Sequence, residues 1–228
     1  MVFMINKRIV IFANGDLPDL EKAKKLIKSD DVLIAADAGA RHILELGLMP
    51  AKAIGDFDSI SPDDLTSMRS SGVEMIPYPS DKDKTDLDLA VDLALVEEAV
   101  SILVLAAFGG RLDMTLSNIT LLLRPDLKDI DISLDDGLQE VFLIKSFAEI
   151  KGNQGDQVSL IPLGKNAEGV STQGLRWPLH HETMEPYSSR GISNEMLGSH
   201  AEVTLQEGSL LCIHRRNGFE ELNDKSEQ

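Results

Sequence analysis

The sequence predicts an α/β N-terminal domain with a mostly parallel sheet, followed by an all-β, sandwich-like C-terminal domain. In the first half, short apolar runs alternate with segments of helical period, which is the pattern of βα units. These runs are nearly continuous in apolar character, as expected for strands that helices cover on both faces. After about residue 129 the helical period is lost, and short strand-like segments are separated by turn residues. We therefore expect domains at residues 1–128 and 129–222 and a polar tail at residues 223–228.

The elements of the first half follow from its apolar runs and capping residues. The runs predict strands at residues 8–13, 31–37, 51–56, 73–78 and 101–108. Amphipathic segments predict helices at residues 17–29, 38–50, 85–99 and 112–124. Ser61 is expected to cap a further helix with Pro62 at its first position. Gly47 and Pro50 end the second helix, and Pro125 ends the last.

The second half is expected to be built from strands alone. Strand-like segments lie at residues 130–136, 139–145, 148–152, 156–164, 168–179, 200–208 and 209–215. Residues 180–190 read as a loop. His180 and His181 in it suggest a metal site, but adjacent residues point in different directions in most backbones, so we interpret them as surface residues.

Composition limits the possible functions. The net charge of −16 in 228 residues repels nucleic acid and anionic membranes, and no Lys/Arg cluster offsets it. The single cysteine, Cys212, cannot form an intramolecular disulfide, which favours a reducing compartment. The N-terminus lacks a signal-type apolar segment, and no apolar run reaches membrane-spanning length. We expect a cytoplasmic protein with neither a nucleic-acid nor a membrane partner.

Polar residues follow every expected strand of the first half. In an open parallel sheet, ligands bind beyond the carboxyl ends of the strands, so these residues are expected to share one edge. In strand order they are Asn14 to Asp16, Asp37, the pair Asp56 and Asp58, residues 81–86 and residues 109–113.

The acidic residues in these positions suggest a metal site. Asp56 and Asp58, in "IGDFDSI", read equally well as loop residues when taken alone. Two carboxylates that converge with a third form an oxygen site suited to Mg²⁺. The stretch "SDKDKTDLDLA" supplies further acids, although capping of a helix explains Thr85 and one of Asp86 and Asp88.

The stretch "FGGRLD" suggests a phosphate site. Two glycines between a strand and a helix leave backbone N–H groups free to bind an oxyanion, and Arg111 can bind phosphate through two hydrogen bonds. Metal carboxylates, an anion cradle and an arginine together indicate phosphoryl-type transfer. The P-loop motif is absent from the sequence, so this is not a P-loop enzyme.

Five motifs in order resemble the thiamine pyrophosphokinase (thiamine diphosphokinase) family: "GDFDSI", "DKDKTDLDLA", "GGRLDMTLSNI", "GLRWPL" and "RGISNE". The resemblance runs from about residue 10 to residue 212. It implies an α/β nucleotide-binding domain, a β-sandwich domain, and a homodimer with active sites across the subunit interface. It also implies transfer of the pyrophosphoryl group of ATP, with Mg²⁺, to the hydroxyl of thiamine, which gives thiamine diphosphate and AMP.

The resemblance also implies roles for individual residues. The metal ligands are Asp56, Asp58 and Asp86, which form the catalytic group together with Arg111. For the mechanism we expect Asp58 or Asp86 as the acceptor of the hydroxyl proton, although a loose transition state makes a strong general base less necessary. The ATP-binding residues are Asn14, Gly15, Asp37, Gly39, Lys82, Asp83, Thr85, Gly109, Gly110, Arg111 and Asp113. The thiamine-binding residues are Trp177, Ser193 and Asn194. Met114 stands where many members of the family have histidine.

Several alternatives stay open at this point. Trp177 can attract a cationic thiazolium, but it also reads as a core tryptophan, and Ser193 and Asn194 as turn residues. The enzyme could act on a pterin-type alcohol instead of thiamine. A non-catalytic nucleotide- or thiamine-sensing module is the third possibility, and it would bind ligand without releasing AMP.

Overall fold

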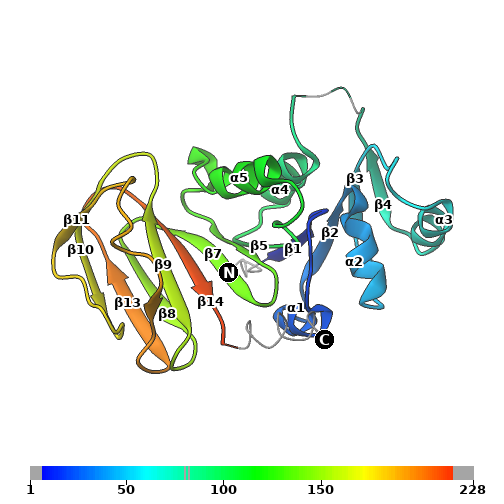
Figure 1. Cartoon of the computed structure of the whole chain (residues 1–228). Coiled ribbons are helices and arrows are strands. Elements are labelled where there is room, and N and C mark those ends of the chain that lie inside the picture. Colours follow the sequence, from blue (N-terminus) through cyan, green and yellow to red (C-terminus); the bar gives the residue numbers. More distant parts are fainter. Residues whose placement is uncertain (1–6, 80, 82, 218–228) are drawn as a thin grey trace, which may run out of the picture. The chain divides into compact units, whose positions relative to one another are not determined.

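The computed structural model describes residues 7–79, 81 and 83–217 and divides the chain into two units, Met1–Gly137 and Leu138–Gln228 (Figure 1). Lys82, expected to bind ATP, and the tail expected at residues 223–228 lie outside the described residues. None of the helices in the described part is long and apolar enough to cross a membrane.

The first unit is built on a parallel sheet, as the sequence predicts. Its strands are β1 (Arg8–Phe12), β2 (Val32–Ala36), β3 (Lys52–Gly55), β4 (Glu74–Pro77), β5 (Ser101–Leu105) and β6 (Asp131–Asp135). They lie in the order β4-β3-β2-β1-β5-β6, and each neighbouring pair is parallel. The chain therefore moves outward from β1 to β4 and then returns to the other side of β1, which puts a topological switch point between β1 and β5.

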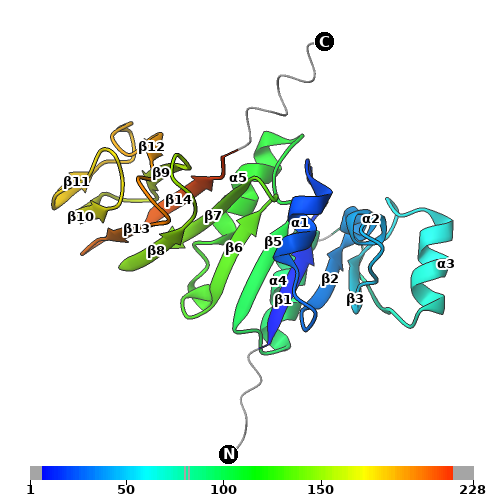
Figure 2. The same ribbon diagram turned by 90° about the horizontal axis from the view of Figure 1, so that it is seen from below.

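Helices cover both faces of this sheet. They are α1 (Leu20–Leu26), α2 (Ala40–Glu45), α3 (Pro62–Ser70), α4 (Asp86–Val96) and α5 (Leu112–Leu121), with short 3-10 turns at Asp37–Gly39 (η1) and Pro125–Leu127 (η2). Figures 1 and 2 show α1 and α2 on one face of the sheet and α4 and α5 on the other.

The buried strand β1 explains why its sequence lacks alternation. Successive side chains point to opposite faces of a sheet. Val10 and Phe12 pack in one core with Ile43 of α2, while Ile9 and Ile11 point to the other face. These four side chains are fully buried. A continuous apolar run is therefore what a strand covered on both faces requires.

One predicted strand belongs to the first unit and not to the second. We expected residues 130–136 to be part of the all-β half, and this prediction is wrong. Strand β6 pairs in parallel with β5, from Ser101 opposite Asp131 to Leu105 opposite Asp135. A short alternating segment has the same period whichever partner it pairs with, so the sequence pattern could not identify the sheet.

The second unit consists of antiparallel strands. They are β7 (Gln139–Ile144), β8 (Phe147–Lys151), β9 (Gln157–Pro162), β10 (Ala167–Gln173), β11 (Glu182–Met184), β12 (Asn194–Glu195), β13 (His200–Thr204) and β14 (Leu210–Arg215). They pair in the orders β12-β9-β14-β7 and β11-β10-β13-β8. Side chains from both sets, among them Leu160, Cys212 and Val203, share one buried core, which is the expected sandwich-like arrangement.

Two strands of this unit have no counterpart in the sequence interpretation. Strand β11 lies within residues 180–190, which we expected to be a loop. Strand β12 contains Asn194, which the alternative interpretation placed in a turn. Both are shorter than the four residues from which an alternating pattern can be recognised.

Candidate active site

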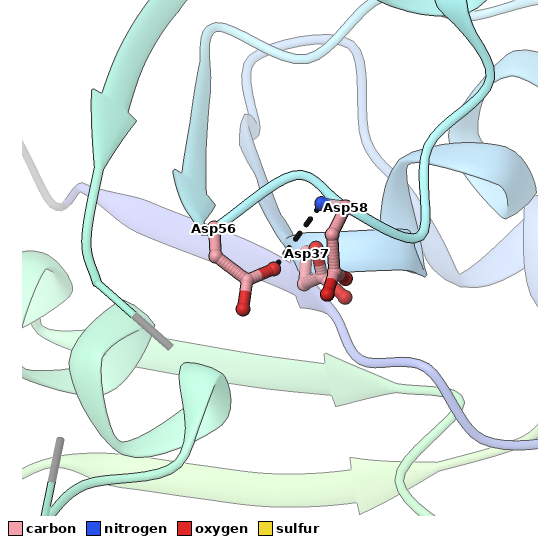
Figure 3. A group of neighbouring side chains, drawn as sticks. All are labelled: Asp37, Asp56 and Asp58. Atoms are coloured by element: carbon pink, nitrogen blue, oxygen red, sulfur yellow. Dashed lines mark hydrogen bonds between the residues drawn. The ribbon is translucent and has the colours of Figure 1, made fainter. Parts of the chain in front are cut away.

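Three carboxylates meet beyond the carboxyl ends of β2 and β3. Asp37, Asp56 and Asp58 each offer an oxygen atom, and these oxygens lie within 4.8 Å of one another (Figure 3). The main-chain N–H of Asp58 donates to Oδ1 of Asp56 over 3.2 Å. Asp37 and Phe57 have φ angles of 47° and 63°, a region that non-glycine residues seldom adopt and that is often found at functional sites.

Asp86, at the start of α4, lies beside this group. A Cβ atom added to Gly55 would stand 3.0 Å from Cβ of Asp37 and 3.1 Å from Oδ1 of Asp86, so both side chains approach the same point of the backbone. Three carboxylates that follow β2 and β3 and one from the start of α4 therefore approach the same edge of the sheet.

The negative charge of Asp37 is disfavoured in this arrangement. It is only 8% exposed, and its Oδ1 has no hydrogen-bond partner among the described residues. Burial raises the pKa of Asp37 above its ordinary value, and repulsion from Asp86, Asp56 and Asp58 adds to the rise. A buried carboxylate oxygen without a partner is costly unless a cation or a proton compensates it. The ligands on offer are all oxygens, which suits Mg²⁺.

We expected Asp56, Asp58 and Asp86 as metal ligands and Asp37 as a nucleotide contact. In the structure, Asp37 instead takes the place of Asp86 in the group formed with Asp56 and Asp58. The sequence put Asp37 at the same edge as these acids, but its approach to β3 depends on the order of the strands.

A pocket of about 470 Å³ opens at the switch point between β1 and β5. This is where an open α/β sheet binds ligands. Its lining includes most of the expected ATP-binding residues, namely Asn14, Gly15, Asp37, Thr85, Gly109, Gly110 and Arg111, together with Asp86, which was expected as a metal ligand. Other lining residues, among them Asp16, Lys84, Phe108, Met114 and Asn118, were not among the expected site residues.

Three expected nucleotide contacts do not line this pocket. Asp83 and Asp113 are exposed, and Gly39 is buried inside η1. A Cβ atom on Gly39 would lie 2.0 Å from the carbonyl oxygen of Phe12, so its place in the fold is explained by close packing of the backbone.

Two loops that line the pocket are hydrogen-bonded to each other. The N–H of Gly15 donates to the carbonyl of Ala106 over 2.8 Å, and that of Asp16 donates to the carbonyl of Phe108 over 2.6 Å. Gly109 has a φ of +100°, and a Cβ atom there would lie 2.0 Å from Oδ2 of Asp16. Only glycine fits this position, and its bare backbone faces the pocket.

Two buried side chains support these loops and were missed by the sequence analysis. Nδ2 of Asn118 donates to the carbonyl of Ala107 over 2.8 Å, and Nε2 of His42 lies 2.9 Å from the carbonyl oxygen of Gly15. Burial lowers the pKa of His42, so the ring is neutral and donates from Nε2. A polar side chain in the middle of a helix was the only available signal.

The start of α4 is held by a capping box. Oγ1 of Thr85 accepts from the N–H of Asp88 over 3.1 Å and donates to its Oδ2 over 2.7 Å. The capping interpretation is therefore correct for Thr85 and Asp88. Asp86, between them, instead lines the pocket, as does Lys84, which pairs with Asp92 over 2.5 Å.

Arg111 is bound by its own neighbour in the structure. Its Nε and Nη2 donate to the two oxygens of Asp113 over 3.2 and 2.5 Å, and these hydrogen bonds lower the pKa of Asp113. Both side chains are exposed, so the pair is weak and water competes with it. The guanidinium can exchange Asp113 for a phosphate, which presents the same paired oxygens.

The three residues expected to bind thiamine lie together in the second unit. Trp177 is 50% exposed, which excludes the core-tryptophan interpretation. Asn194 is buried, and its side-chain amide is hydrogen-bonded to the main chain of Trp177. Ser193 is exposed, with a φ of 56°, and its N–H donates to Oγ of Ser159 over 3.0 Å.

Comparison with known proteins identifies a family. The model "Thiamin pyrophosphokinase, catalytic domain" matches residues 23–134, and "Thiamin pyrophosphokinase, vitamin B1 binding domain" matches residues 148–210. The thiamine pyrophosphokinase of Bacillus subtilis is 30% identical over 182 residues, which are 79% of this chain and 85% of that protein. Thiamine pyrophosphokinase 1 of Oryza sativa subsp. japonica is 31% identical over 210 residues, with 81% and 79% covered.

Solved structures agree with the sequence comparison. The crystal structure of thiamine pyrophosphokinase from Bacillus subtilis matches with a TM-score of 0.84 at 27% identity, covering 92% of this chain and 100% of that one. The structure of thiamin pyrophosphokinase from Geobacillus thermodenitrificans matches with a TM-score of 0.81, also at 27% identity, covering 93% and 99%.

Proposed function

Because the chain belongs to the thiamine pyrophosphokinase family, we propose that it transfers the pyrophosphoryl group of ATP to the hydroxyl of thiamine, forming thiamine diphosphate and AMP. The observation that carries this proposal is the convergence of Asp37, Asp56 and Asp58 beside a pocket at the switch point of the sheet. The pterin-type enzyme is not favoured, because the matching relatives are thiamine pyrophosphokinases. The sensing module is not favoured either, because the acidic residues are present.

We assign Mg²⁺ to the carboxylates. Asp56, Asp58 and Asp86 were expected to hold it. The buried Oδ1 of Asp37 has no partner in the described part of the chain, which supports adding that residue as a fourth. Bound there, the ion would neutralise negative charge on the phosphates during transfer.

The remaining pocket residues bind and orient the nucleotide. Gly109 and Gly110 present main-chain N–H groups to phosphate oxygens, and Arg111 leaves Asp113 to bind the phosphates. Either Asp58 or Asp86 accepts the proton of the thiamine hydroxyl as the oxygen attacks the β-phosphorus and AMP leaves.

Thiamine recognition is assigned to the second unit. The half-exposed indole of Trp177 offers a π-face to the permanently charged thiazolium. The division of labour, with ATP bound by the first unit and thiamine by the second, is supported by the descriptions of the two matching family models. The family resemblance also supports a homodimer, which light scattering of the purified protein tests. The single cysteine supports a cytoplasmic enzyme.

The test is to incubate the protein with Mg-ATP and thiamine and to separate thiamine, its two phosphates, AMP and ADP by chromatography. Equal amounts of thiamine diphosphate and AMP are expected. Thiamine monophosphate with ADP would mean that a single phosphoryl group is transferred. Binding of ATP without product would refute the proposal, and a hydroxymethylpterin acceptor in place of thiamine then tests the alternative enzyme.

Two variants test the metal assignment. We expect Asp56→Asn and Asp86→Asn to lower turnover by about 100-fold each, because each removes a ligand charge opposite the phosphates. Asp129→Asn, an exposed acid far along the chain from the site, is the matched control and should be unchanged. Near-normal turnover in both site variants would show that the metal assignment is wrong.

A further inference from the structure

The side-chain amide of Asn194 is hydrogen-bonded to both the N–H and the carbonyl of Trp177. Its Oδ1 accepts from the N–H of Trp177 over 3.0 Å, and its Nδ2 donates to the carbonyl of Trp177 over 2.7 Å. Oδ1 also accepts from the N–H of Glu195 over 2.9 Å. The side chain is 7% exposed. Both functional atoms of this amide are therefore used inside the protein and turned away from solvent.

The amide acts next to an isolated antiparallel bridge between Leu175 and Met196. Two hydrogen bonds of 2.9 Å flank this bridge, from the N–H of Arg176 to the carbonyl of Glu195 and from the N–H of Leu197 to the carbonyl of Gly174. At Trp177 this main-chain pairing stops, and the side chain of Asn194 supplies the acceptor and donor that another strand would supply. A primary amide carries its acceptor and its donor on separate atoms, so it can bond to the N–H and to the carbonyl of one residue at once.

One face of the indole is already occupied. The guanidinium carbon of Arg176 lies 5.1 Å from the centroid of the Trp177 ring, within cation–π distance. Nη1 of Arg176 is held by Oε2 of Glu195 over 3.0 Å, which opposes its charge and restrains it. A cationic ligand therefore has the other face of the ring available.

We propose that Asn194 is a positioning residue for thiamine recognition: it acts through Trp177, whose main chain it holds so that the indole presents one face to the thiazolium. This inference rests on the proposed function. It differs from the sequence expectation, in which Asn194 contacts thiamine directly. The amide is buried and makes three of its four possible hydrogen bonds inside the protein, which is the observation that favours the indirect role.

The single tryptophan makes the test direct, because the intrinsic tryptophan fluorescence of the protein comes from Trp177 alone. We would titrate thiamine into the wild type and the Asn194→Ala and Asn194→Asp variants, recording fluorescence quenching and anisotropy, and then measure kcat and KM for both substrates. Asn217→Ala is the matched control. It also removes a side-chain bond to a main-chain carbonyl, Nδ2 to Gln154 over 2.8 Å, but away from Trp177.

For Asn194→Ala we expect the KM for thiamine to rise about tenfold, while kcat and the KM for ATP stay within about twofold. The anisotropy of Trp177 should fall, because the freed indole moves more. Asn194→Asp has the same shape and keeps the Oδ1 acceptor, but its second oxygen would repel the carbonyl of Trp177 where Nδ2 now donates. Its KM for thiamine should therefore rise and its anisotropy fall, as in Asn194→Ala, and because it leaves no cavity it provides the test if the alanine variant unfolds. Asn217→Ala should match the wild type.

Two results would overturn the inference. If the KM for thiamine rose while the anisotropy stayed at the wild-type value, Asn194 would contact thiamine directly. If Arg176→Ala bound thiamine more than about threefold tighter, Arg176 would compete for the substrate face, and the single open face would be wrong. A wild-type enzyme that makes no thiamine diphosphate would instead refute the proposed function itself, so the two failures are distinguishable.

Discussion

Asp37→Asn should make the protein more stable without metal and less responsive to Mg²⁺. The substitution keeps the shape of the side chain and removes one charge from the acidic group. In the wild type this charge is buried, and Oδ1 has no partner among the described residues. The variant therefore loses repulsion in the metal-free protein and loses a ligand when Mg²⁺ is present.

The size of the effect follows from the distance. The oxygens of Asp37, Asp56 and Asp58 lie within 4.8 Å of one another. At that separation two unit charges repel by about 1 kcal/mol in water and by about 3.5 kcal/mol at the effective dielectric constant of a protein. Because Asp58 is exposed, we take a value near the lower limit, about 1–2 kcal/mol for the variant. In a protein of this size that raises Tm by about 3–6 °C.

The pH dependence provides a second check of the same reasoning. The pKa of Asp37 is raised, so between its unfolded value of 3.8 and its folded value the folded state binds more protons than the unfolded state. The cost of the charge is therefore present above the folded pKa and disappears as pH falls toward 3.8. The advantage of Asp37→Asn should be largest at neutral pH and shrink on acidification.

The assay is thermal unfolding of wild type and Asp37→Asn in chelator and in a Mg²⁺ series. The wild type should gain stability with Mg²⁺, by about 2.7 kcal/mol at 100 times its Kd, and the variant should gain less. Asp129→Asn, an exposed change outside the site, should follow the wild type in both conditions. A lower Tm for Asp37→Asn in chelator would refute the repulsion argument, and an equal response to Mg²⁺ would refute the ligand assignment.

Three further predictions concern stability. Thr85→Ala removes the capping box of α4 and should lower the free energy of unfolding by about 1 kcal/mol in urea titrations, whereas Thr85→Ser should retain most of it. His42 is neutral because burial lowers its pKa, so the unfolded state takes up more protons below about 6.5. The wild type should lose Tm between pH 7 and 5.5 more steeply than His42→Gln, and parallel slopes would contradict the buried neutral ring. Burial raises the pKa of Asp156, but hydrogen bonds from the N–H groups of Asn217 and Asn153 and from His214 outweigh it and lower the pKa below 3.8. Asp156→Asn should therefore cost about 3 kcal/mol at neutral pH, and this difference should narrow only when the pH falls through the lowered pKa. A difference that already closes at pH 5 would show that Asp156 is not held as a stabilised carboxylate.

Much of the secondary structure was predictable because it depends on neighbouring residues. Ser61 caps α3 with Pro62 at its first turn, as its sequence indicates, and Oγ accepts from the N–H of Asp64 over 3.1 Å. The predicted ends of helices were less accurate. We expected a helix from residue 17, but α1 begins at Leu20, because Asp19 caps it by accepting from the N–H of Lys22.

The site was predictable to the extent that it depends on the ends of strands. Polar residues after successive parallel strands must share an edge, and the pocket does collect Gly15, Asp86 and Gly109. The place of Asp37 in the carboxylate group and the roles of His42 and Asn118 were not predictable, because they depend on which strands and loops are neighbours.

The sequence by itself determined the two fold classes, the caps, the acidic edge and, through five ordered motifs, the family. These are properties of local periodicity and residue chemistry, which a chain carries whatever its tertiary arrangement. Only the tertiary structure decided the strand order, the switch point between β1 and β5, the place of β6, and the use of the Asn194 amide to hold Trp177. Each of these is a pairing between residues distant in sequence, and a local pattern is compatible with several such pairings until packing selects one.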